Sequence, residues 1–217
     1  MGNKALVVYS GGLDSTVLLK SALEEYDTVE AISFYYGAKH NNNELIMARK
    51  QCNKLEIKHT MVTLDFIGNL FKSDLLSNGG EIPEGHYAAE NMKSTVVPLR
   101  NGIMLMIACG YADSHGIGNV LLASHAGDHY IYPDCRPKFN QYLTSAVLEG
   151  TEGKVTVKFP FATLNKAEIV VLGSKLGVDF KNTWSCYKGG RAPCGKCGTC
   201  VERKEAFELA GVNDPNG

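Results

Sequence analysis

The sequence ALVVYSGGLDSTVLL, residues 5–19, predicts a strand, a glycine turn and a helix in immediate succession. Residues 5–9 are apolar and partly β-branched, which is typical of a buried parallel strand. The residues Ser10-Gly11-Gly12 form the expected turn, and a helix is expected to follow. Free backbone N–H groups and the positive end of a helix dipole then surround one small volume. This arrangement favours an anion, and phosphate is the obvious candidate.

The loop in this segment differs from two common nucleotide-binding motifs. A Walker A loop needs Gly, four residues and then Gly-Lys-Ser or Gly-Lys-Thr, and the near match at residues 190–197 ends in Cys and follows no expected strand. The loop also lacks the GxGxxG spacing. SGGLDS resembles, residue for residue, the SGGxDS signature of the PP-loop ATP pyrophosphatases, which cleave ATP between its α and β phosphates. An ordinary glycine turn before a helix is the alternative interpretation.

This resemblance implies roles for the residues of the loop. The loop would hold the departing pyrophosphate, and Asp14 would lie where it can help to hold Mg²⁺. Ser10, Asp14 and Ser15 are therefore candidate catalytic residues. The predicted ATP-binding residues of the loop are Ser10, Gly11, Gly12, Leu13, Asp14, Ser15 and Thr16.

Composition indicates a globular protein that acts on a small molecule. The 217 residues are 44% hydrophobic and 21% charged, and no run approaches the roughly 18 apolar residues that span a bilayer. A net charge of −1 gives no overall attraction to nucleic acid or to an anionic membrane. No export signal is visible at the start, so we expect a cytoplasmic protein whose seven cysteines are thiols or metal ligands rather than a disulfide framework.

Strand and helix patterns alternate along the chain. Strands are expected at residues 5–9, 29–37, 57–64, 119–124 and 155–159, and helices at residues 14–25, 43–55, 65–77, 102–111, 137–148, from 165 onward and 201–210. This alternation predicts an α/β fold with an open, parallel, five-stranded Rossmann-like sheet and helices on both faces. We expect a catalytic domain over residues 1–180 and a small zinc-binding segment over residues 181–217.

Ligands of an open α/β sheet bind beyond the carboxyl ends of its strands. Phe34 and Tyr35 end the second strand beside the loop, so we assign them to the adenosine wall, with core aromatics as the alternative. Arg100 and Asn101 precede a buried helix and are placed to reach a nucleotide or a substrate carboxylate. A surface arginine followed by a helix-capping asparagine is the other interpretation. Residues 78–86, rich in turn residues, predict a long loop that serves as a lid or a dimer contact.

The densest group of polar residues, 125–136, follows the fourth expected strand. Its position and composition predict a substrate site, and a metal site built on its histidines is the alternative. The predicted substrate-binding residues are His125, Asp128, Tyr132, Asp134 and Arg136. Lys166 stands in the first turn of a later helix, which Asn165 is expected to cap together with Glu168. We predict that Lys166 is a second cation for the phosphates and a fourth candidate catalytic residue, the alternative being that it faces water.

The C-terminal segment carries a second strong pattern, four cysteines of which three follow one another at two-residue intervals. They are Cys186, Cys194, Cys197 and Cys200. Four such thiolates fit a closed tetrahedral Zn²⁺ site, whose role is structural because no coordination position is left for water. Free thiols and an iron–sulfur cluster are the alternatives.

Taken together, the motifs resemble the 7-cyano-7-deazaguanine synthase family over about the full length of the chain. The resemblance rests on SGGLDST, PLRN, YPDCR, NKAE and SCY…CGKCGTC, in that order. It implies that ATP, Mg²⁺ and ammonia are used to convert 7-carboxy-7-deazaguanine into the nitrile, in the queuosine and archaeosine precursor pathway. It also implies a Zn²⁺ on the four cysteines and a homodimer. The chain departs from many members at residues 125–129, HAGDH in place of a Glu-Thr-Asp segment, and at Leu99, where Gly is common.

Several other activities are compatible with parts of this sequence. A relative that stops at the amide is the first alternative, and a PP-loop tRNA-modifying enzyme is the second, although the neutral charge and short tail count against RNA. A sulfur-transferring relative needs catalytic thiols, and zinc binding leaves only three scattered cysteines for that role. A non-catalytic zinc-linked binding module leaves the glycine loop unexplained.

Overall fold

The computed structural model describes residues 3–216 and contains a five-stranded, all-parallel sheet in the order β3-β2-β1-β4-β5. Its strands are β1 (Lys4–Val8), β2 (Thr28–Tyr35), β3 (His59–Thr63), β4 (Asn119–Leu121) and β5 (Thr156–Lys158). The chain runs outward from β1 to β3 and then returns to the other side of β1 with β4. The register places Leu6 of β1 between Glu30 of β2 and Val120 of β4. The switch point of the sheet therefore lies between β1 and β4, and the glycine loop that begins at Ser10 follows β1 at this point.

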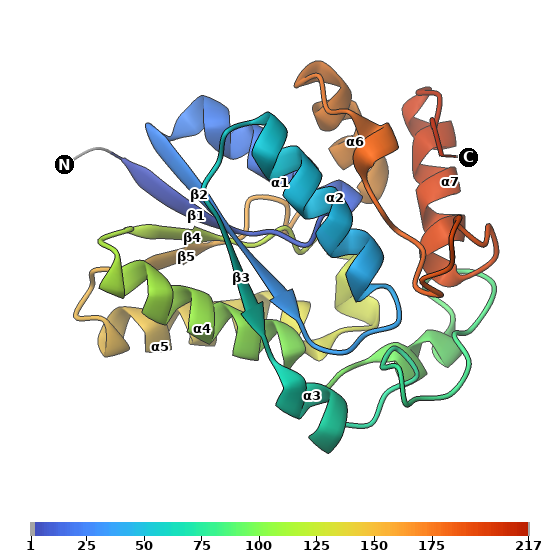
Figure 1. The fold of residues 1–217 in the computed structure, drawn as a ribbon, viewed down its shortest axis with the longest axis horizontal. Helices are drawn as coiled ribbons and strands as arrows, with labels where there is room; N and C mark the ends of the chain where they lie inside the picture. The colour runs from blue at the N-terminus through green and yellow to red at the C-terminus, as the bar shows by residue number, and fades with distance from the viewer. Residues whose placement is uncertain (1–2, 217) are drawn as a thin grey trace.

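Helices cover both faces of this sheet, as Figure 1 shows. They are α1 (Leu13–Glu25), α2 (Asn41–Lys54), α3 (Asp65–Leu70), α4 (Arg100–Ser114), α5 (Pro137–Gly150), α6 (Lys166–Lys175) and α7 (Gly198–Ala210). Four short 3₁₀ helices occupy connections: η1 (Glu90–Thr95), η2 (Ala126–Tyr130), η3 (Pro133–Cys135) and η4 (Phe180–Asn182). The expected α/β class and the five-stranded parallel sheet with helices on both faces are confirmed.

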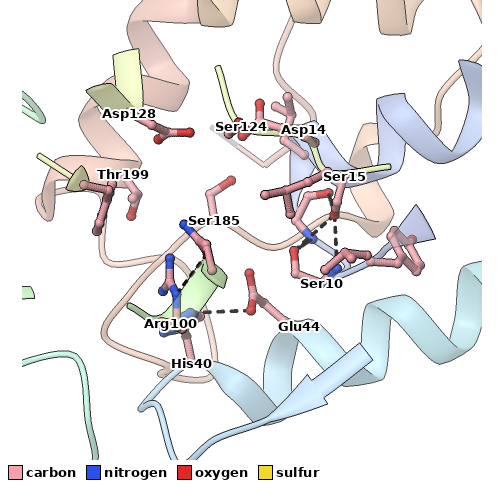
Figure 2. A pocket seen from close by; sticks show the side chains of 18 of the residues that line it. Ser10, Asp14, Ser15, His40, Glu44, Arg100, Ser124, Asp128, Ser185 and Thr199 are labelled. Carbon is pink, nitrogen blue, oxygen red and sulfur yellow. Dashed lines mark hydrogen bonds and ion pairs between the residues drawn. The ribbon is translucent and has the colours of Figure 1, made fainter. Parts of the chain in front are cut away.

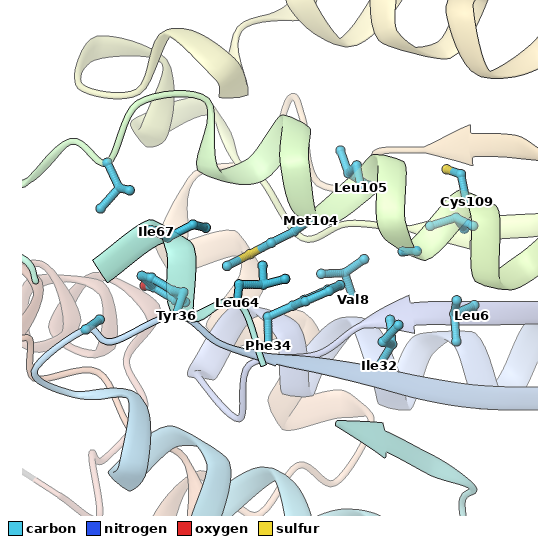
Figure 3. Close-up of a cluster of buried hydrophobic side chains, with 14 of the residues drawn as sticks. Leu6, Val8, Ile32, Phe34, Tyr36, Leu64, Ile67, Met104, Leu105 and Cys109 are labelled. Atoms are coloured by element: carbon cyan, nitrogen blue, oxygen red, sulfur yellow. The ribbon is translucent and has the colours of Figure 1, made fainter. Parts of the chain in front are cut away.

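Alternation along the strands divides the core into two layers. Leu6 and Val8 of β1 pack with Met104 and Leu105 of α4 on one face, as Figure 3 shows. Ala5, Val7 and Tyr9 face the other way, toward α1, α2, α6 and α7. Since both faces are buried, β1 has an uninterrupted apolar sequence rather than an alternating one.

The structure differs from the sequence expectation most clearly after β3. A helix was expected over residues 65–77, but α3 ends at Leu70. The two consecutive leucines Leu75 and Leu76 are both fully buried, and the Lys39 ammonium donates to the carbonyls of Asp74 and Gly80. Tertiary packing and this lysine therefore hold residues 71–80 in a loop where local spacing favours a helix.

Two further boundaries bear on the site. The helix expected over residues 102–111 begins at Arg100, so Arg100 and Asn101 belong to its first turn rather than to the preceding loop. The fourth strand ends at Leu121 rather than residue 124, which leaves Ser124 in the connection beyond the sheet. The predicted cap of α6 is confirmed, because Asn165 Oδ1 accepts from the Glu168 N–H at 3.0 Å and the Glu168 carboxylate accepts from the Asn165 N–H at 2.8 Å.

Candidate active site

A cleft opens at the carboxyl ends of β1, β2 and β4 and encloses ≈ 1110 Å³ of empty space, its open mouth included. Figure 2 shows side chains from both ends of the chain directed toward it. Ser10 and Ser15 lie on one side, and Arg100, Asp128 and Thr199 lie on the other. The cleft thus occupies the position at the switch point where open α/β sheets bind their ligands.

The loop after β1 is held in shape by its own hydroxyl groups and by the tail of the chain. Ser10 Oγ accepts from the Gly12 N–H at 3.0 Å and lies 3.1 Å from Ser15 Oγ. Thr16 Oγ1 donates to the Gly12 carbonyl at 2.7 Å, and the Trp184 N–H donates to the Gly11 carbonyl at 3.1 Å. The loop is therefore set before any ligand binds, which lowers the entropic cost of binding.

Gly11 is required at its position for two reasons. Its φ is +90°, a conformation that L side chains rarely adopt, and a Cβ there would lie 2.2 Å from the Glu44 carbonyl oxygen. The loop consequently packs directly on the backbone of α2. This contact is why glycine, rather than another small residue, stands at position 11.

The loop delivers the N-terminus of α1 to the cleft. Gly12 is the N-cap residue, and among the described residues no side chain caps this end of the helix. The N–H groups of the first turn are therefore free for a ligand, together with the hydroxyls of Ser10 and Ser15. This is the position at which the sequence predicts an anion, and residues of the loop and of the first turn of α1 line the cleft.

Lys166 lies at the centre of a buried charged cluster beside this loop. Its Nζ is 2.9 Å from Asp14 Oδ2, 2.9 Å from Glu202 Oε2 and 3.4 Å from His125 Nε2. Burial alone would lower the pKa of Lys166, but the carboxylates of Asp14, Glu202 and Asp128 raise it above its ordinary value. Lys166 therefore stays charged, and the alternative that it faces water is excluded for this structure.

His125 connects Lys166 to the acidic side chains. Its Nδ1 accepts from the Gly127 N–H at 3.1 Å, which assigns the ring proton to Nε2. Nε2 lies 3.5 Å from Asp128 Oδ1 and 3.8 Å from Glu202 Oε1. Burial would raise the pKa of Asp128, but His125, Lys166 and the hydrogen bonds it accepts hold that pKa below its usual value. Burial raises the pKa of Glu202.

Arg100 forms the opposite wall together with tyrosines. Its Nη1 donates to the Tyr36 hydroxyl at 3.1 Å, and its Cζ is 5.6 Å from the ring centroids of both Tyr36 and Tyr132. The Tyr132 and Tyr187 hydroxyls are 2.9 Å apart. Within residues 3–216, the hydrogen bonds of the guanidinium go to Tyr36 and Asn101, and no carboxylate forms a salt bridge with it. A partly buried guanidinium without a carboxylate partner can donate hydrogen bonds to a bound anion.

Glu44 and His40 stand between the loop and Arg100. His40 Nε2 lies 3.4 Å from Glu44 Oε2, and the His40 ring lies against that of Tyr187 with centroids 4.9 Å apart. Burial raises the pKa of Glu44 to about 8, against the opposing effects of Arg100 and Ser10. Burial also lowers the pKa of His40 to about 3, and Arg100 acts in the same direction. Both groups are consequently neutral over most of the range around pH 7.

The four C-terminal cysteines form a candidate metal centre at the start of α7. Their Sγ atoms all lie within 4.8 Å of one another, and the closest separations are 3.5 Å, 3.9 Å and 4.0 Å. A tetrahedron of sulfurs about 2.3 Å from one ion has edges of about 3.8 Å. The cysteines therefore fit a single metal ion. A [4Fe–4S] cluster places each thiolate on a different iron and needs wider spacing.

The four cysteines lie in a segment that borders the cleft. Trp184, Ser185, Tyr187 and Thr199 all line the cleft and all lie close in sequence to the four cysteines. Arg203 of α7 holds the same segment, since it donates to Thr183 Oγ1 at 2.8 Å and forms an ion pair with Asp214. The predicted division at residues 180 and 181 therefore falls beside the site.

The structure gathers most of the predicted site residues. Those that line the cleft are Ser10, Gly12, Leu13, Asp14, Ser15, Phe34, Arg100, Asn101, Asp128, Tyr132 and Lys166. His125 contacts this group from behind, through Lys166 and Asp128. Gly11 and Thr16 support the loop from beneath without lining the cleft.

Three predicted residues lie elsewhere. Tyr36, not Tyr35, continues the cleft wall from Phe34, because alternate residues of an extended chain share a face. Asp134 is buried outside the lining of the cleft and accepts from the Asn101 N–H at 2.8 Å, which stabilises the start of α4. Arg136 is exposed, and its Nε donates to the His129 carbonyl.

Sequence reasoning missed several residues of the cleft. They are Tyr36, His40, Glu44, Tyr87, Ser124, Trp184, Tyr187, Thr199 and, in the charged cluster, Glu202. Glu202 follows the last cysteine by two residues on α7, and its separation from Lys166 in sequence gives no hint that the two side chains pair. The motif SCY contains Tyr187 directly after the cysteine Cys186, so this motif could have indicated Tyr187 as a residue of the site.

The chain is similar in sequence to named proteins over nearly its whole length. The family model described as "Queuosine biosynthesis protein QueC" matches residues 4–211. The 7-cyano-7-deazaguanine synthase of Desulfotalea psychrophila is 57% identical over 94% of this chain and 93% of its own. The same-named protein of Porphyromonas gingivalis is 51% identical over 97% and 95%, and that of Methanoregula boonei is 46% identical over 98% and 97%.

Solved structures agree with the fold. The U34-tRNA thiolase NcsA from Methanococcus maripaludis, described with its [4Fe-4S] cluster, aligns with a TM-score of 0.53 at 16% identity, over 96% of this chain and 66% of its own. The NMN synthetase of Francisella tularensis aligns with a TM-score of 0.53 at 17% identity, over 98% and 79%. At such identities the likeness concerns the fold alone. The sequence match, in contrast, shows that this chain belongs to the queuosine biosynthesis protein QueC family.

Proposed function

We propose that this protein is a ligase that converts 7-carboxy-7-deazaguanine and ammonia into 7-cyano-7-deazaguanine, using two molecules of ATP. One observation carries the proposal: the open N-terminus of α1 faces, across a single cleft, an Arg100 guanidinium that lacks a carboxylate partner among residues 3–216. The first site suits the phosphates of ATP, and the second suits the carboxylate of a substrate. The names of the most similar relatives support the nitrile rather than the amide as the product.

The proposed chemistry takes place in two rounds. In the first, a carboxylate oxygen attacks the α phosphorus of ATP, pyrophosphate leaves, and ammonia then displaces AMP to give the amide. In the second, the amide oxygen attacks another ATP, and loss of AMP and of the nitrogen-bound protons forms the C≡N bond. Both rounds develop negative charge on phosphate oxygens, which the N–H groups of α1, the hydroxyls of Ser10 and Ser15, and Lys166 are placed to stabilise.

The tyrosines around Arg100 are proposed to hold the flat, fused ring of the substrate. Tyr36, Tyr132 and Tyr187 present ring faces and hydroxyls together, and Asp128 offers a carboxylate to ring N–H and amino groups. Arg136 is exposed, so Arg100 is the residue we assign to the substrate carboxylate. Phe34 is retained as part of the adenosine wall.

Two metal ions belong to this proposal. Asp14 Oδ1 is buried without a hydrogen-bond partner among the described residues, which fits an oxygen that helps to hold Mg²⁺. Bound there, Mg²⁺ supplies charge neutralisation for the pyrophosphate. Zinc is the metal proposed for the four cysteines, because a closed set of four thiolates suits Zn²⁺ and a structural role.

The sequence predictions of a homodimer and a cytoplasmic location stay part of the proposal. Leu99, which precedes α4, and Met106 within it are both exposed apolar side chains, as an interface between two copies requires. Of residues 3–216, no helix is both long enough and apolar enough to cross a membrane.

Incubation of the purified protein with 7-carboxy-7-deazaguanine, ATP, Mg²⁺ and ammonia tests the function, with products measured by mass spectrometry. The expected result is the nitrile with two AMP per product. The amide with one AMP would instead support an amide-forming enzyme. Release of ADP, or no nucleotide release that depends on this substrate, would refute the proposal.

A further inference from the structure

Glu44 is a carboxyl in the cleft that the proposed binding roles do not use. It belongs to the first turn of α2, and its side chain lies between Ser10 and Arg100 (Figure 2). Its Oε1 is close to the loop, since a Cβ on Gly12 would lie 3.4 Å from it. Glu44 therefore stands between the site proposed for phosphates and the site proposed for the acyl group.

The other carboxyls of the cleft are already engaged. Asp14 is paired with Lys166 at 2.9 Å, and Asp128 accepts from the Tyr87 hydroxyl at 3.0 Å and from the His125 N–H at 3.1 Å. Glu44 faces the imidazole of His40 at 3.4 Å, and no lysine or arginine among residues 3–216 forms a salt bridge with it. Of these three carboxyls, Glu44 is the one that is free to exchange a proton with a ligand.

The second round of the proposed reaction needs such a group. After the amide oxygen has been adenylated, the nitrogen still carries two protons, and both must leave before a nitrile exists. In the first round the attacking ammonia becomes cationic and loses its proton readily. The need for a positioned base is therefore concentrated in the second round.

We propose that Glu44 is the general base of nitrile formation. The O-adenylated amide first forms as a cation, which loses one nitrogen-bound proton to water and becomes the neutral imidate. The Glu44 carboxylate takes the remaining proton from the nitrogen, the N–H electron pair becomes the third C–N bond, and the C–O bond breaks as AMP leaves. Glu44 gains one proton, and no oxidant or further reactant takes part. This inference rests on the proposed function and gives Glu44 a role in its second round.

The surroundings of Glu44 suit both rounds. The groups that face it are Ser10 of the loop, Arg100 of α4, Tyr36 at the end of β2 and His40 at the start of α2. Burial raises the pKa of Glu44 to about 8, so its neutral form meets the negatively charged substrate of the first round and donates a hydrogen bond to it. The substrate of the second round is a neutral amide, and the ionised form then faces its N–H groups.

The variant Glu44→Gln separates these two uses. A glutamine still donates a hydrogen bond, as the neutral carboxyl does, but it cannot accept a proton. With the acid as substrate, we expect amide to form within about threefold of the wild-type rate and to accumulate. With the amide supplied directly, we expect nitrile formation to fall at least about 100-fold, the usual contribution of a general base. The wild-type rate from amide should rise with pH through about 8, and the variant should lose this rise.

Asp128→Asn is the matched control, because it changes another cleft carboxyl that we place in substrate binding, and it should slow both rounds by similar factors. Nitrile formation from amide at near the wild-type rate in Glu44→Gln would overturn the base role. An equal loss of both rounds, with ATP binding retained, would overturn it too. If Glu44→Gln fails to fold, Glu44→Asp takes its place, and it must slow the second round selectively while keeping the pH dependence. A wild-type protein that releases no AMP would refute the proposed function itself.

Discussion

Replacement of Gly11 by alanine is the substitution for which the structure gives the clearest energetic consequence. At φ +90° an alanine is strained, which costs about 1–3 kcal/mol. Its Cβ would also lie 2.2 Å from the Glu44 carbonyl oxygen and 2.7 Å from the Ala48 nitrogen. Both are backbone atoms of α2, so they can yield only if the helix moves, at a further cost of about 1–3 kcal/mol.

The two contributions predict a loss of at least about 2 kcal/mol in the free energy of unfolding, which for a chain of this length lowers the Tm by at least about 4 °C. The same clash displaces the loop, and with it the Ser10 hydroxyl and the N-terminus of α1 that we propose bind the phosphates, so AMP release should fall with stability. Thermal unfolding and AMP release are the two measurements.

Gly110→Ala is the control for this prediction. Gly110 lies within α4, and in the described structure no heavy atom is within 4 Å of the position of an added Cβ. Alanine is favoured over glycine in a helix by about 1 kcal/mol, so this variant should gain stability and keep its activity. If Gly11→Ala unfolds within about 1 °C of the wild type, the packing argument is wrong. Wild-type AMP release from this variant would contradict the role given to the loop.

Three other substitutions test separate parts of the structure. Cys197→Ser should lose the bound metal and lower the Tm, and a chelator applied to the wild type should have the same two effects. Metal analysis and thermal unfolding check this. Full metal content in the variant would refute the assignment of Cys197 as a ligand. Lys166→Met should leave Asp14 and Glu202 as unpaired buried carboxylates and lower the free energy of unfolding by about 3 kcal/mol. It should also lower the rate of AMP release at least about 100-fold. Stability equal to that of the wild type in denaturant unfolding would contradict the pairing. Glu44→Gln should stabilise the fold more at pH 8 than at pH 5. An unfolded glutamate ionises near pH 4.5, whereas folded Glu44 keeps its proton to about pH 8, so the stability of the wild type falls across that interval. An equal change in Tm at both pH values would count against the raised pKa of Glu44.

Local sequence was sufficient for the parts of the site that are built from neighbouring residues. The loop of residues 10–16 and the cysteines at 194, 197 and 200 each form one contiguous turn, so residue type and spacing define their geometry. The capping of α6 by Asn165 was predictable for the same reason. The cleft is lined by Tyr36 and not by Tyr35. Local sequence does not distinguish these two neighbouring aromatics, because the outcome depends on which face of the extended chain is directed toward the cleft.

The sequence by itself determined the alternation of strands and helices, the glycine loop before the first helix and the group of C-terminal cysteines, since these depend on periodicity and on contacts within a few residues. Only the tertiary structure decided which side chains meet in the cleft. Glu202 reaches Lys166 because α7 packs against α6, and Tyr187 reaches Tyr132 because the C-terminal part of the chain folds back to line the cleft. It also showed that Asp134 accepts a hydrogen bond from the first turn of α4 and that Glu44 faces the loop. Such contacts join residues far apart in sequence, and their energies depend on burial, which no local pattern encodes.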